Sequence, residues 1–108
     1  MYQNLLPIGS IVQLQGEEYR VMICGRVLGK SGEDKLYDYA ACQYPQGLMD
    51  AELIFFNRDD IQETYFIGFQ DPEELYFRKE ILGKLDDLSI ADGEIVAGKR
   101  VGAEGEEG

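Results

Sequence analysis

Short apolar runs separated by turn residues make up the first two thirds of the chain. They cover residues 11–15, 19–28, 36–44, 53–56 and 63–69, with glycine, proline or charged residues between them. Short runs at this close spacing, rich in β-branched and aromatic residues, indicate antiparallel strands. The pattern predicts a mainly β (α+β) fold, either a small curled antiparallel sheet or an SH3-like barrel of about five strands.

Turn and breaker residues refine this picture. Gly25 lies inside the second run, where a glycine indicates a bulge or a bend of the strand. Pro45 ends the third run, because proline cannot continue a strand ladder. Asn57 is expected to cap a single helical turn over residues 58–61, since its side chain can accept from the free amides of that turn.

The sequence Asp71-Pro72-Glu73-Glu74 predicts the start of one C-terminal helix. It combines an N-cap aspartate, a proline at the first helical position and a glutamate three residues after the cap. The helix is expected to run to about Leu85, with Gly83 able to end it a turn earlier. Its apolar stripe is expected to pack on the protein's own sheet rather than on a partner.

The length of 108 residues allows one domain with one core. We predict a single globular domain over residues 1–85. From residue 86 to 108 aliphatic residues become sparse while glycine and glutamate accumulate, so this segment is predicted to be an acidic, Gly-rich flexible tail. Ile90, Ile95 and Val96 leave open a short strand within it.

The charge of the chain excludes several classes of partner. Twenty-one acidic residues against 10 basic ones give a net charge of −11, which repels nucleic acid and anionic membrane surfaces. The first residues lack the basic region and apolar run of a signal peptide, and no segment approaches the ~18 apolar residues of a membrane span. We therefore expect a cytoplasmic protein with no nucleic-acid and no membrane partner.

Candidate chemistry is sparse. The chain has no histidine, so Cys24 and Cys42 have no Cys–His couple and are interpreted as small hydrophobes. Residues 57–63 lack the glycine and the spacing of a calcium loop, and the glycines of residues 25–32 do not follow a nucleotide-binding pattern. Solvated faces and helix caps account for the adjacent carboxylates. We expect no catalytic residue, no metal and no cofactor.

Aromatic residues are concentrated between residues 37 and 69, and there are too many of them for a small core to bury. Exposed rings supply contact area at little entropic cost. A partner-binding surface is predicted with four anchors and an acidic rim. The anchors are Tyr37, Tyr39, Tyr44 and Phe56, and the rim is Asp38, Asp59 and Asp60. The alternative, ordinary strand aromatics that cover the edge of the core, stays open.

An ordered series of short motifs resembles a known family. The motifs are Leu6-Pro7-Ile8-Gly9-Ser10, Met22-Ile23, Gly25-Arg26, Tyr37-Asp38-Tyr39, Cys42, Tyr44-Pro45, Gly47, Phe55-Phe56-Asn57, Asp60-Ile61, Phe66, Gly68 and Asp71. Over about residues 5–75 they resemble the small domain-of-unknown-function proteins encoded beside LXG-type toxins in type VII (Esx) secretion loci of Gram-positive bacteria. The resemblance does not extend beyond about Leu85.

This resemblance implies a targeting factor or chaperone without catalytic residues. Such a protein would bind the helical N-terminal LXG region of a toxin, together with a WXG-like helical protein, so that the complex is exported. Two alternatives remain. An immunity protein would neutralise the toxin domain through an acidic surface, and a small β-barrel enzyme of unknown substrate would need a pocket with buried polar groups.

Overall fold

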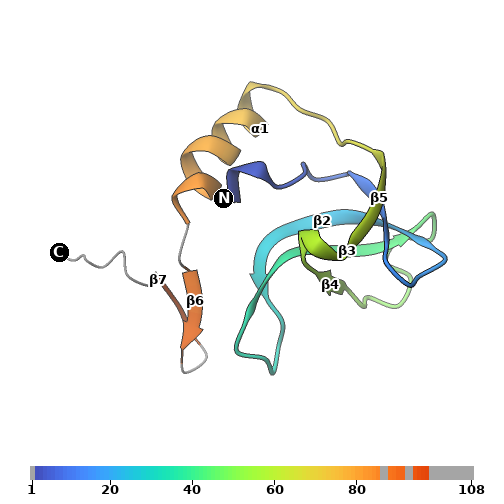
Figure 1. Ribbon diagram of the computed structural model, residues 1–108, viewed down its shortest axis with the longest axis horizontal. Helices are drawn as coiled ribbons and strands as arrows, with labels where there is room; N and C mark the ends of the chain where they lie inside the picture. The colour runs from blue at the N-terminus through green and yellow to red at the C-terminus, as the bar shows by residue number, and fades with distance from the viewer. Residues whose placement is uncertain (1, 86–87, 92–93, 98–108) are drawn as a thin grey trace.

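The computed structural model describes residues 2–85 and the backbone of residues 88–91 and 94–97 (Figure 1). Its main body is a five-stranded antiparallel sheet in the order β4-β3-β2-β1-β5. The strands are β1 (Ile11–Leu14), β2 (Arg20–Gly29), β3 (Leu36–Tyr44), β4 (Ile54–Phe56) and β5 (Ile61–Phe66). The sheet is curled but not closed, because β4 and β5 are both edge strands. The predicted curled sheet is confirmed, and the barrel form is not adopted.

A bulge bends β2 at the predicted place. Ile23 lies opposite Ala41 and Gly25 lies opposite Ala40, so Cys24 is an extra residue in the ladder. One inserted residue shifts every later side chain of a strand to the other face of the sheet. Arg26 therefore lies opposite Tyr39 on the inner face.

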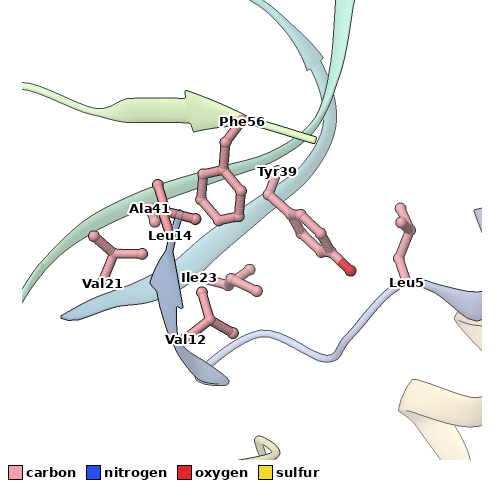
Figure 2. Packing of buried hydrophobic residues seen from close by; sticks show 8 residues of the cluster. All are labelled: Leu5, Val12, Leu14, Val21, Ile23, Tyr39, Ala41 and Phe56. Atoms are coloured by element: carbon pink, nitrogen blue, oxygen red, sulfur yellow. The ribbon is translucent and has the colours of Figure 1, made fainter. Parts of the chain in front are cut away.

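The core lies on this inner face and is shown in Figure 2. Its members are buried, and Val12 and Leu14 alternate along β1 with the half-exposed Ile11 and Gln13. This alternation is the pattern of a sheet with one covered face. The cluster consists of Leu5, Val12, Leu14, Val21, Ile23, Tyr39, Ala41 and Phe56.

Tyr39 joins this core to the N-terminal segment, because its hydroxyl oxygen accepts a hydrogen bond of 2.8 Å from the Leu6 N–H. Replacing Tyr39 by phenylalanine leaves that partly buried N–H without its acceptor and should cost about 1–3 kcal/mol of unfolding free energy. Tyr65→Phe is the matched control, since its hydroxyl donates to Gln13 at the exposed surface. Urea unfolding of both variants measures the difference, and equal stabilities would contradict the role of Tyr39.

Burial also raises the pKa of the Tyr39 phenol above its ordinary value of 10.0. The folded state then holds this proton more tightly than the unfolded chain does. The stabilisation is complete below the unfolded pKa and is lost as the pH rises through the folded pKa. Tyr39→Phe should therefore reduce the loss of stability above pH 10.

The C-terminal helix begins as predicted. The Asp71 carboxylate accepts a hydrogen bond of 2.9 Å from the Glu74 N–H, and Pro72 occupies the first turn. The helix starts as α1 (Pro72–Tyr76), continues through a wider π-type turn (Phe77–Ile81), and ends in a 3-10 turn (Leu82–Lys84). It ends at Lys84, close to the expected end at about Leu85, and Gly83 lies within the last turn.

The expectation that this helix covers the sheet is wrong. It lies beside the sheet, against the N-terminal turn η1 (Tyr2–Asn4) (Figure 1). Leu82 is its buried residue, whereas Leu75, Tyr76 and Ile81 stay exposed. The main polar link to the sheet is the ion pair between Arg26 and Glu74, which holds the helix at the end of β2.

A separate hairpin follows the helix. It consists of β6 (Leu88–Ala91) and β7 (Glu94–Ala97), which pair antiparallel outside the main sheet. The hairpin falls within the segment predicted to be a flexible tail, and residues 98–108 of that segment lie outside the described residues. No helix in the described part of the chain is long and apolar enough to cross a membrane.

Candidate interaction surface

Strand pairing defines a second, outward face of the sheet. Residues directly opposite each other on neighbouring strands point to the same side, and the core residues occupy the other side. We call this surface the outer sheet face. It comprises Ile11, Gln13, Arg20, Met22, Cys42, Tyr44, Glu63 and Phe66 by strand register, and Tyr65 by its contacts with Gln13 and Arg20.

Arg20 lies at the centre of one row of this face. Its guanidinium carbon is 4.8 Å from the Tyr65 ring centroid and 5.9 Å from the Tyr44 ring centroid. Cation–π contacts at exposed sites contribute about 0.5–1 kcal/mol each. The Tyr65 hydroxyl also donates to the Gln13 side chain at 3.0 Å. The row therefore connects β3, β2, β1 and β5 through side chains.

This face exposes large apolar groups. Tyr44, Tyr65 and Phe66 are 40%, 47% and 56% exposed. Two further apolar residues that follow β5 in the sequence, Ile67 and Phe69, are also exposed. Contiguous exposed apolar surface on a small protein is typical of an interaction site.

Two of the predicted anchors belong to the core instead. Tyr39 and Phe56 are 1% and 3% exposed, and their ring centroids are 5.3 Å apart. The two residues lie opposite each other on β3 and β4, on the inner face of the sheet (Figure 2). Their expected exposure is therefore wrong, since the register turns both rings toward the core.

Two residues of the predicted acidic rim, Asp38 and Asp60, instead form hydrogen bonds that stabilise the connection between β4 and β5. One Asp38 oxygen accepts from the backbone N–H and the Nε of Arg58 at 2.9 and 3.1 Å. Asn57 accepts from the Asp38 N–H, and its own N–H donates to Asp60, both at 2.9 Å. Together these bonds fix the turn η2 (Arg58–Asp60), where Asp59 is exposed.

Tyr37 lies away from the outer sheet face, near the turn between β2 and β3. Its hydroxyl donates to the Glu33 carboxylate at 2.6 Å, and this bond is the main reason that the pKa of Glu33 is lowered. The Tyr37 ring packs 5.6 Å from that of Phe55. Of the seven predicted residues, Tyr44 alone is a member of the outer sheet face.

Sequence reasoning missed Arg20, Tyr65 and Phe66 as site residues. Along β2, Arg20 precedes the buried Val21, but β5 shows no alternation of exposure and its pairing with β1 is irregular. Register shifts occur on both sides of the segment that pairs Val12 with Thr64 and Gln13 with Glu63. A simple period of two cannot locate such shifts.

A half-open hollow of about 350 Å³ lies beside the loop that follows β3. Its wall includes Tyr19, Gln43, Met49 and Asp50, all of them exposed. Ser10 is a fully buried polar residue of the described core, and its hydroxyl is used in structural hydrogen bonds. It donates to the Pro7 carbonyl at 2.7 Å and accepts from the Gly68 N–H at 2.9 Å. Within residues 2–85, no group of three or more potential metal ligands forms.

Comparison with known proteins places this architecture in a family. The model of a domain of unknown function, DUF4176, matches residues 5–77. This span contains the whole five-stranded sheet, the outer sheet face and the start of the helix. No curated protein and no solved structure is similar enough to count as a match. Because the matched span is well over half of the chain, the protein belongs to the DUF4176 family.

Proposed function

We propose that this DUF4176 protein is a non-catalytic targeting factor, acting in the cytoplasm, that binds the helical N-terminal region of an LXG-type toxin for type VII secretion. The observation that carries the proposal is the outer sheet face, on which exposed rings gather around Arg20. The motif resemblance to the proteins encoded beside LXG toxins supplies the class of partner.

A long amphipathic helix suits this surface. Its apolar stripe would cover Tyr44, Tyr65 and Phe66, which span the sheet from β3 to β5. Arg20 would donate to carboxylates beside the stripe. A helix on an apolar surface is a common mode of peptide recognition, and aromatic and arginine residues contribute a large share of binding energy at such contacts.

The test uses the toxin encoded beside this protein, produced as separate N-terminal and C-terminal halves. The tagged protein should retain the N-terminal half. A double variant, Tyr65→Ala with Phe66→Ala, should weaken this binding by about tenfold or more, because it removes two adjacent rings. Leu48→Ala with Met49→Ala is the matched control, since both side chains are exposed but lie on the loop outside the outer sheet face.

Thermal unfolding of both double variants separates lost binding from lost folding. Wild-type binding by a folded Tyr65/Phe66 variant would refute the role of the outer sheet face. Retention of the C-terminal half alone would support an immunity protein instead, for which the net charge of −11 is suitable.

A further inference from the structure

The direction of the backbone groups can be followed across the sheet from β2. The Ile23 N–H donates to the Ser10 carbonyl and the Ile23 carbonyl accepts from the Gly9 N–H, both at 2.8 Å. Ile23 therefore turns its backbone toward the β1 side. The backbone N–H and C=O groups of successive residues in a strand point to alternate sides, so those of Val21 also point toward β1. Val12, directly opposite Val21, faces β2 in return.

The same alternation continues into β5. The backbone N–H and C=O of Gln13 point toward β5, because those of its neighbour Val12 point toward β2. The Gln15 N–H, two residues further on, agrees with this, since it donates to the Asp60 carbonyl at 2.9 Å. Thr64 lies opposite Val12. The N–H and C=O of Thr64 consequently point away from the sheet, where no strand in the described part of the chain pairs with β5.

This edge lacks proline and lysine, two common protections against strand pairing, although two register shifts interrupt its pairing with β1. Natural edge strands are kept short or carry proline or lysine. The opposite edge, β4, has three residues, whereas β5 has six, of which the five from Gln62 to Phe66 are exposed. It contains neither proline nor lysine, and Glu63 is its single charged residue. The edge can therefore accept another strand.

The charges near β5 indicate which kind of segment could pair with its free edge. No lysine or arginine occurs between Arg58 and Arg78. Three exposed carboxylates lie just before or within the edge strand, namely Asp59, Asp60 and Glu63. A second copy of this chain would bring the same carboxylates against them, whereas lysine or arginine residues would pair with them.

We infer that the free edge of β5 binds an extended segment of a partner polypeptide, with alternating apolar residues and flanking basic residues, as an added strand. This site goes beyond the proposed function, which uses side chains of the outer sheet face to hold a helix. Recognition at the edge depends on backbone hydrogen bonds, so it can be tested separately.

The test measures binding of a short synthetic peptide in which valine alternates with threonine and two lysines stand at each end. Thr64→Pro removes the outward N–H without removing a bond to β1. It should weaken peptide binding about tenfold, whereas Thr64→Ala, which keeps the N–H, should bind like the wild type. Fluorescence anisotropy of the labelled peptide gives the affinities, and thermal unfolding shows that each variant is folded.

A second measurement covers the case in which Thr64→Pro fails to fold. Peptides N-methylated at every other residue, in both phases, are compared on the unchanged protein. One phase should lose binding and the other keep it. Equal binding by both phases, undiminished binding to folded Thr64→Pro, or no binding to the wild-type protein would overturn the inference. So would a wild-type dimer that Thr64→Pro converts to monomer, because the edge would then bind a second copy.

Discussion

Glu74→Ala is expected to lower the free energy of unfolding by about 3–5 kcal/mol, because it leaves the charge of Arg26 buried without its partner. The two guanidinium nitrogens of Arg26 bind the Glu74 carboxylate at 2.7 and 2.9 Å. The two side chains are 6% and 12% exposed. Chemical denaturation followed by circular dichroism measures the loss.

The expected loss of stability depends on the burial of the ion pair, so an exposed ion pair serves as the control. Glu80 lies 3.2 Å from Lys84 on the same helix, and the Lys84 side chain is largely exposed. Glu80→Ala should cost no more than about 0.5 kcal/mol. The paired replacement Arg26→Met with Glu74→Leu should recover most of the loss, since neither charge then remains. A cost for Glu74→Ala as small as that for Glu80→Ala would contradict the buried ion pair.

Gly68→Ala should be the second severe substitution, with an expected cost of about 3 kcal/mol or more from overpacking. An added Cβ would overlap the Ile8 carbonyl oxygen and approach the Ser10 nitrogen to 3.0 Å. Both neighbours are backbone atoms, so no change of rotamer can relieve the overlap. The shift would also break the bond from the Gly68 N–H to the Ser10 hydroxyl.

Gly25→Ala provides the comparison for this prediction. A Cβ there would meet the Leu28 side chain at 3.3 Å, and that side chain can move. Its cost should therefore be clearly smaller than that of Gly68→Ala. Thermal unfolding ranks the two variants, and the reverse order would show that the approach of Gly68 to Ile8 is not a tight one.

Local signals in the sequence were sufficient for the elements themselves. The bulge at Gly25, the end of β3 before Pro45 and the helix start at Asp71 each depend on one residue type whose backbone or side chain allows few alternatives. The structure has all three where they were expected. The five-stranded sheet follows from these elements.

The position of the helix could not be predicted in the same way. It depends on Arg26 reaching the inner face, which the extra residue Cys24 brings about. A glycine indicates that a bulge is present, but not which residue is inserted. The partner Glu74 is 48 residues further along the chain, and a pair at such a separation leaves no local pattern.

The candidate surface was predicted only in part, for a similar reason. Tyr37 and Asp38 are half-buried and Tyr39 is buried, in a strand with partners on both sides, so the burial of β3 does not follow a simple alternation. The composition alone could not tell which rings of the aromatic segment face the core. Tyr44 is 40% exposed, since it lies at the end of β3, beyond the last residue that pairs with β4.

The strand order has a consequence for how the polypeptide reaches this architecture. β2 and β3 are neighbours in sequence and can pair early in folding. β1, however, must also pair with β5, which brings Ile11 next to Phe66. Closing so long a loop costs entropy before any contact offsets it, which slows the step. During translation, the edge of β1 that pairs with β5 stays unpaired until Phe66 has left the ribosome.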